Sequence, residues 1–227
     1  MTTNSNYNVL VIGDHGVGKT SFINRFINDS FVFKENSKSF TVGVNDNYKK
    51  INLSNDEKVL DEKVLKVIDT DGDIKTNSTS FKNACKTAHG VIIVYDITNK
   101  TSFENVSEWL KKIKDYNIMP DTVIYLIGNK SDLDNKRGLD NKRQVQSKDA
   151  TEWPNNNLIS YKTSVYETSV KNNTINHIFP TQNKSLTDES RTLIKQKKID
   201  HIFTNIAEQI KNAKQLSRPD PSCCSIS

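Results

Sequence analysis

A glycine-rich motif near the N-terminus constrains the fold of this chain more than any other feature. The motif runs from Gly13 to Thr20 with the spacing G-x-x-x-x-G-K-T, directly after the apolar run Val9–Ile12. Residues 21–27 carry apolar side chains at helical spacing, so the segment predicts a buried strand, a tight loop and a helix. Glycines let consecutive backbone N–H groups converge on a polyphosphate, and the helix N-terminus adds positive potential. The motif therefore predicts a phosphate-binding loop.

The side chains of this loop have expected roles. Lys19 would reach the β- and γ-phosphates of a nucleotide, and the Thr20 hydroxyl would bind Mg²⁺. The alternative is an ordinary turn with chance glycine and lysine residues, which the flanking strand and helix disfavour. Nucleotide contacts are expected from Gly13, Asp14, His15, Gly16, Val17, Gly18, Lys19, Thr20 and Ser21.

Apolar runs and amphipathic helical segments alternate along the rest of the chain. Strands are expected near residues 9–12, 48–53, 59–68, 91–95 and 123–127 and from residue 158 onward. Apolar residues at helical spacing occur between and after them, as over 102–113 and 199–216. This alternation predicts an α/β fold with a mostly parallel six-stranded sheet and helices on both faces. Ligands bind such sheets at the carboxyl ends of the strands.

Tandem copies lengthen the chain at three places. Residues 56–60 recur as 61–65, residues 133–137 as 139–143, and residues 161–165, with one substitution, as 166–170. Polar repeats are tolerated in surface loops, where longer connections cost little free energy. We expect one domain over residues 1–216, with inserted loops near 133–143 and 176–199, and a flexible tail over 217–227.

Composition narrows the class of protein. The 227 residues are 34% hydrophobic and carry a formal net charge of +5, which is mild for this length and does not indicate a nucleic-acid partner. No segment approaches the run of about 20 apolar residues that a membrane helix needs. Residues 1–6 lack the pattern of a signal peptide, so we expect the protein in the cytosol.

Two further polar motifs follow predicted strands. In Asn129–Lys130–Ser131–Asp132, the Asp132 carboxylate can accept hydrogen bonds from both the ring N–H and the exocyclic amine of guanine, a pair that adenine lacks. Lys130 would lie along the base, and Asn129 would tie this loop to the phosphate-binding loop. After the first motif, this one predicts a guanine nucleotide as the ligand.

The other motif has the spacing D-x-x-G, from Asp69 to Gly72. Asp69 would bind Mg²⁺ through water, and the Gly72 N–H would contact the γ-phosphate. Thr41 is the candidate for a second hydroxyl on Mg²⁺, reached only when the triphosphate is present. Taken singly, each of these residues is equally well explained as a turn residue.

In this order, the motifs resemble those of the Ras superfamily of small GTPases, in particular its Rab branch. The matching segments are residues 13–20, 41–44, 95–98, 102–106, 129–132 and 167–171. The resemblance implies a P-loop NTPase G domain that binds GTP or GDP with Mg²⁺ and regulates vesicle and membrane traffic. Thr41 and Gly72 would order two switch loops around the γ-phosphate and release them after its loss. Effectors, an exchange factor and a GTPase-activating protein would bind these loops.

The chain departs from the family where hydrolysis is catalysed. Asp73 stands where the family has the Gln that orients the attacking water, and Asp71 adds a carboxylate near the phosphates. We hypothesise slow intrinsic hydrolysis, with Lys19, Thr41 and Asp73 as candidate catalytic residues. The bulk of His15 would obstruct an arginine finger, unless His15 is merely a solvated loop residue. A membrane-bound scaffold that depends on nucleotide but hydrolyses little or none is the alternative function.

Two copies of Thr-Ser-Val compete for the role of guanine-binding loop. A backbone N–H after the serine would contact guanine O6 in either copy. Thr163–Ser164–Val165 fits a short last strand, whereas Ser169 and Val170 lie in Glu167–Lys171, which matches the family better. We favour the second copy.

The end of the chain has the pattern of a lipidation signal. Cys224 with the three residues after it fits C-a-a-X, and the Rab resemblance implies geranylgeranylation of both Cys223 and Cys224. Two lipids anchor a protein stably where one does not. We therefore expect a lipid-anchored protein on the cytoplasmic side of an intracellular or plasma membrane, with a cytosolic pool.

Overall fold

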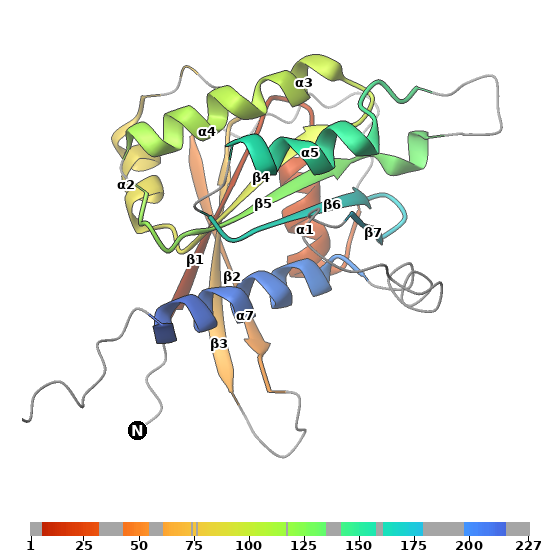
Figure 1. The fold of residues 1–227 in the computed structure, drawn as a ribbon. Helices are drawn as coiled ribbons and strands as arrows, with labels where there is room; N and C mark the ends of the chain where they lie inside the picture. The colour runs from red at the N-terminus through yellow and green to blue at the C-terminus, as the bar shows by residue number, and fades with distance from the viewer. Residues whose placement is uncertain are drawn as a thin grey trace, which may run out of the picture.

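A twisted sheet forms the centre of the computed structural model of this chain (Figure 1). The structure describes residues 6–31, 43–54, 61–73, 75, 77–116, 118–134, 142–157, 161–178 and 198–216. Within them the sheet has seven strands in the order β2-β3-β1-β4-β5-β6-β7. The strands are β1 (Asn6–Ile12), β2 (Val44–Asn52), β3 (Glu62–Thr70), β4 (Gly90–Asp96), β5 (Val123–Asn129), β6 (Thr163–Ser169) and β7 (Thr174–Ile178).

The central strands run parallel, and each edge strand runs antiparallel to its neighbour. β1 pairs in parallel with β3 and β4, and β5 pairs in parallel with β4 and β6. β2 pairs antiparallel with β3, and β7 pairs antiparallel with β6. Every residue of β4 and β5 is buried, as expected for strands covered on both faces.

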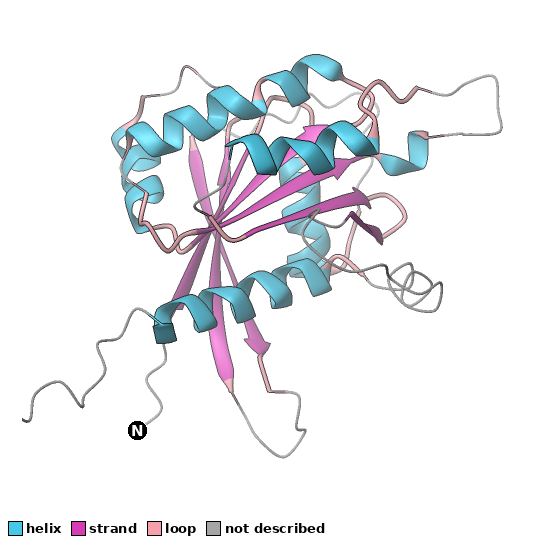
Figure 2. Ribbon diagram, in the orientation of Figure 1, coloured by secondary structure: helices cyan, strands magenta, loops and turns pink. Residues whose placement is uncertain are grey.

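Helices pack on both faces of the sheet (Figure 2). They are α1 (Lys19–Asn28), α2 (Thr79–Thr87), α3 (Lys100–Glu104), α4 (Val106–Asp115), α5 (Ser147–Asn157), α7 (Asp200–Leu216) and the 3₁₀ turn η1 (Ser131–Leu133). One hydrophobic core joins α1 and α7 to one face, and a second joins α2, α4 and α5 to the other. This arrangement confirms the predicted α/β fold class.

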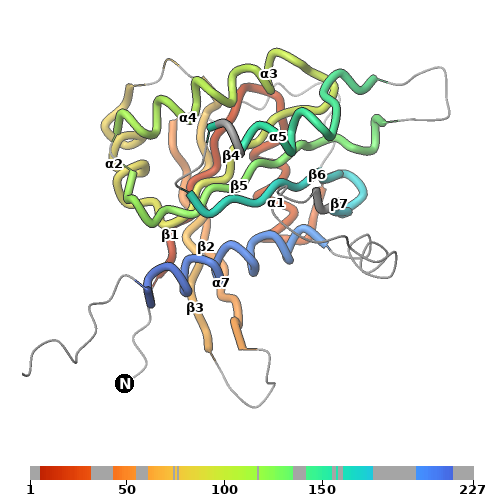
Figure 3. The backbone as a smooth tube through the Cα atoms, in the orientation of Figure 1, coloured from red at the N-terminus to blue at the C-terminus, as the bar shows by residue number. Residues whose placement is uncertain are grey.

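The seventh strand corrects the prediction of six. Residues 174–178 form β7 at the opposite edge of the sheet from β2, although residues from 176 onward were expected to be a loop (Figure 3). Their backbone pairs with β6 from Thr174 opposite Ser169 to Ile178 opposite Val165. Pairing with an existing strand decides the structure here, because β propensity depends strongly on context. The other predicted insertion, near 133–143, lies partly outside the described residues.

Candidate functional site

The phosphate-binding loop has the backbone path that its glycines predict. Gly13, Gly16 and Gly18 all have positive φ, at 137°, 76° and 98°. A Cβ on Gly13 would lie 2.1 Å from the carbonyl oxygen of Val94 in β4, so any larger residue would collide with backbone. The loop joins the end of β1 to the start of α1, which places it at the carboxyl edge of the sheet.

Lys19 is the buried cation of this loop. It is 5% exposed, and its ammonium group donates to the Asp14 carbonyl oxygen at 2.8 Å. Burial lowers the pKa of Lys19 to about 8, although neighbouring carboxylates, Asp69 foremost, oppose that shift. A desolvated ammonium group at a helix N-terminus is suited to binding phosphate oxygens.

Two predicted Mg²⁺ ligands lie next to each other. The Thr20 hydroxyl donates to Asp69 Oδ2 at 2.6 Å, which joins the first turn of α1 to the end of β3. Hydroxyl and carboxylate oxygens suit Mg²⁺, which takes few protein ligands and completes its shell with water and phosphate. The donor set therefore fits the ion. Thr41, the third predicted ligand, lies outside the described residues.

Asn129 connects the phosphate-binding loop to the loop after β6. Its side-chain amide donates to the Val17 carbonyl at 2.9 Å, and its Oδ1 accepts from the Val170 N–H at 3.3 Å. Thr168 Oγ1 also donates to this oxygen at 3.3 Å. Because Asn129 is only 3% exposed, these bonds lie within the protein interior. Two loops distant in sequence are thereby fixed against each other.

The second copy of Thr-Ser-Val is the one at this edge of the sheet. Ser169 Oγ donates to Asp132 Oδ1 at 2.7 Å. In the first copy, Val165 lies within β6 opposite Leu126 of β5, away from the carboxyl ends. The structure thus brings Ser169 and Val170 together with the Asn129–Asp132 loop.

Lys130 has a partner that the sequence analysis did not predict. Its backbone is left-handed, with φ of 67°, and its ammonium group lies 2.6 Å from Asp96 Oδ2 at the end of β4. The Asp96 carboxylate also accepts from the Thr98 N–H and hydroxyl. The sequence marked Asp96 only by its position directly after an apolar strand and by its place in the family-like segment 95–98, neither of which gives its partner.

The Asp14 carboxylate bonds to residues outside the phosphate-binding loop, whereas its backbone carbonyl bonds to Lys19 within the loop. Its two carboxylate oxygens accept from Asn105 Nδ2 at 2.7 Å and from Trp109 Nε1 at 2.8 Å. These bonds attach the loop to α4. Val17 is 1% exposed and belongs to the hydrophobic core, so it presents only backbone to a ligand, whereas His15 is exposed to solvent.

The acidic segment after β3 lies against the phosphate-binding loop. A Cβ on Gly72, where φ is 80°, would lie 2.4 Å from Lys19 Nζ and 2.9 Å from the His15 N–H nitrogen. Asp71 Oδ1 accepts from the Asp73 N–H, and Asp73 Oδ1 accepts from the Lys75 N–H. Both carboxylates are thus held in tight turns.

A lysine on α4 lies within electrostatic reach of these carboxylates. Lys112 lies over the Phe81 and Trp109 rings, with its nitrogen 5.3 and 5.9 Å from their centroids. Burial lowers the pKa of Lys112, and Asp73 and Asp71 oppose that shift. The cation therefore offsets part of the negative charge that the acidic segment brings to the site.

The lipidation candidates Cys223 and Cys224 lie outside the described residues. No helix in the part of the chain that the structure describes has the length and apolar character needed to cross a membrane.

The fold and the arrangement of this edge define a P-loop GTPase-type α/β domain. A family model described as Ras family matches residues 8–188. The chain therefore belongs to the Ras family, and its relatives place it on the Rab branch.

Three relatives illustrate the similarity. Ras-related protein Rab-13 of Canis lupus familiaris is 38% identical over 130 residues, covering 56% of this chain and 58% of the relative. Ras-related protein RabS of Dictyostelium discoideum is 35% identical over 133 residues, covering 56% and 59%. Ras-related protein RABA6a of Arabidopsis thaliana is 34% identical over 129 residues, covering 56% and 50%. The matches thus span between half and three fifths of the length of these relatives.

Proposed function

We propose that this protein is a Rab-like guanine-nucleotide switch that binds GTP and GDP with Mg²⁺ and regulates vesicle and membrane traffic. One observation carries the proposal: Asn129 bonds both to Val17 of the phosphate-binding loop and to Val170 of the loop after β6. A base held near Asp132 would therefore lie at a fixed distance from phosphates held near Lys19.

The roles of the residues follow from their chemistry. Asp132 would accept hydrogen bonds from the guanine edge. The Lys171 N–H, in the turn after Ser169, would donate to guanine O6, because the Val170 N–H donates to Asn129. Mg²⁺, held by Thr20, Asp69 and Thr41, would neutralise phosphate charge. Lys19, buried and cationic, would bind the β- and γ-phosphates.

We propose that intrinsic hydrolysis is slow. Asp73 carries a carboxylate where water must be oriented, and its Oδ1 already accepts from the Lys75 N–H. Asp71 adds a second negative charge beside the γ-phosphate position. Lys112 offsets this charge in part, so we expect the two carboxylates to reduce the affinity for GTP less than they reduce the rate of hydrolysis.

The membrane and partner roles belong to the same proposal. Geranylgeranylation of Cys223 and Cys224 would anchor the protein to the cytoplasmic face of a membrane. Effectors, an exchange factor and a GTPase-activating protein would bind the switch loops. The Rab names of the relatives support this assignment.

The acidic segment also supports a second candidate function, a nucleotide-dependent scaffold on a membrane with little or no GTPase activity. If Asp71 and Asp73 exclude the γ-phosphate, the protein would remain in the GDP form and act as a fixed binding platform.

Nucleotide binding and single-turnover hydrolysis, measured on wild type and on Asp73→Gln in Mg²⁺, test both functions. We expect tight GTP and GDP binding, with faster hydrolysis in Asp73→Gln because a glutamine amide orients water. Binding of GDP without GTP would favour the scaffold. Failure to bind either nucleotide would refute both functions.

A further inference from the structure

An arginine on α1 holds the turn that follows β6. Arg25 Nε donates to the Val170 carbonyl at 3.0 Å, and its Nη2 donates to the Lys171 carbonyl at 3.1 Å. Its third nitrogen donates to the Asp29 carbonyl at 3.1 Å. The Arg25 side chain is 12% exposed, and its bond to the Val170 carbonyl is partly buried, whereas the bonds to Lys171 and Asp29 lie at the surface. A planar guanidinium group can hold consecutive carbonyls in fixed geometry, which an ammonium group cannot.

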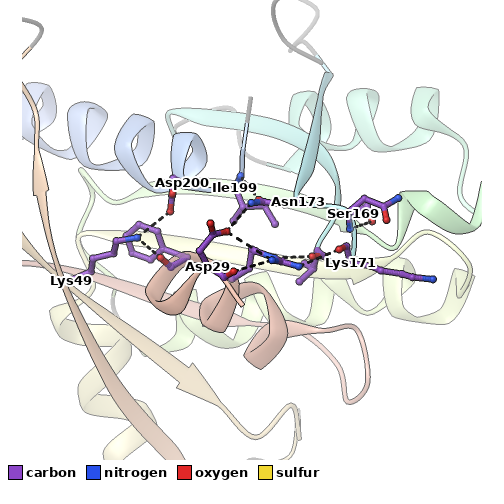
Figure 4. A network of polar contacts seen from close by, with 11 residues as sticks. Asp29, Lys49, Ser169, Lys171, Asn173, Ile199 and Asp200 are labelled. Carbon is purple, nitrogen blue, oxygen red and sulfur yellow. Dashed lines mark hydrogen bonds and ion pairs between the residues drawn. The ribbon is translucent and has the colours of Figure 1, made fainter. Parts of the chain in front are cut away.

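The other end of the turn is tied to the same helix (Figure 4). The Asp29 carboxylate accepts from Asn173 Nδ2 at 3.0 Å, and Asn173 Oδ1 accepts from the Ile199 N–H at 3.1 Å. Asn173 has a left-handed backbone with φ of 53°, which marks a sharp change of chain direction before β7. The turn over 169–173 is therefore held from α1 on both sides.

The same turn faces the proposed base site. Ser169 Oγ donates to Asp132, and the Val170 N–H donates to Asn129. The Val170 carbonyl held by Arg25 shares its peptide plane with the Lys171 N–H, which would meet guanine O6. Moving the Val170 carbonyl would therefore rotate the peptide plane that carries this donor, since each plane is rigid.

We propose that Arg25 is a positioning residue that sets the lifetime of bound guanine nucleotide by fixing the turn over 169–173 through the carbonyls of Val170 and Lys171. The inference rests on the proposed function, because it assumes that a guanine base occupies the site beside Asp132. Arg25 acts on the dissociation rate, since the turn must open for the base to leave. It acts little on association, which depends on encounter with the open site.

Dissociation of a fluorescent GDP analogue in excess Mg²⁺ tests this role in the full chain. Loss of the two carbonyl contacts in Arg25→Ala should raise the dissociation rate about tenfold or more. Arg25→Lys should fall between this variant and wild type, because a lysine can contact one carbonyl but cannot span both. The matched control is Lys148→Ala, which removes an exposed cation of α5 and should change the rate by less than about twofold.

A second readout separates positioning from general stability. The diphosphate of 2-aminopurine riboside lacks the O6 oxygen, so its affinity should fall less than that of GDP in Arg25→Ala. Unchanged GDP dissociation in Arg25→Ala would overturn the inference, and so would equal loss of affinity for both ligands. Wild-type protein that does not bind GDP would instead overturn the proposed function, and the inference with it.

Discussion

Replacing Asn129 by alanine should separate the two halves of the nucleotide site. The side chain is buried, and its removal leaves the Val17 carbonyl and the Val170 N–H without their side-chain partner. A buried polar group left unsatisfied costs about 1–3 kcal/mol, so two such groups cost about 2–6 kcal/mol. The free energy of unfolding of the GDP-bound Asn129→Ala variant should therefore be about 2–6 kcal/mol below that of wild type.

The matched control is Thr168→Val, which removes one hydroxyl donor to the same Asn129 oxygen and keeps a similar side-chain shape. Because it leaves the backbone groups of Val17 and Val170 bonded, it should cost only about 0.5–1.5 kcal/mol.

Urea unfolding of wild type and both variants in saturating GDP measures these two losses of stability, since bound GDP stabilises only the folded state. If Asn129→Ala loses no more stability than Thr168→Val does, Asn129 does not hold the two loops together.

Three further predictions concern single features of the site. Asp132→Asn should weaken GDP binding at least about tenfold and shift base preference away from guanine, measured by competition between nucleotides; unchanged GDP affinity would contradict the base assignment. Gly16→Ala should lower the free energy of unfolding in urea by about 1–2 kcal/mol, because only the strain of a left-handed backbone opposes a Cβ there. Gly13→Ala should cost roughly 2 kcal/mol more, because its Cβ would also collide with Val94, and equal costs would contradict this. Lys112→Met should lower GTP affinity relative to GDP about two- to tenfold, because the acidic segment loses a nearby positive charge. An unchanged affinity ratio would show that this charge does not reach the γ-phosphate.

Local sequence patterns predicted the central part of the fold well. Gly13–Thr20 follows a buried strand and opens a helix, as its spacing indicated, and the apolar runs at 91–95 and 123–127 lie within β4 and β5. The spacing of such motifs reflects backbone geometry over a few residues, which a sequence displays directly.

Contacts between distant segments could not be predicted in this way. Arg25 occupies an ordinary helix position, and its carbonyl partners lie 145 and 146 residues further along the chain. The motif assigned Asp14 to the nucleotide, but its carboxylate accepts from Trp109 of α4 and from Asn105, directly before that helix. In both cases the packing of α1 or α4 decides the partner.

The duplication over residues 161–170, which spans β6, places its two copies in different surroundings. Successive side chains of a strand alternate between faces, so a repeat of five residues places equivalent residues on opposite faces. Val165 packs in the core beneath α4 and α5, and Val170 packs in the core beneath α1 and α7. The two copies therefore meet different packing requirements, and a side chain that fits at Val165 need not fit at Val170.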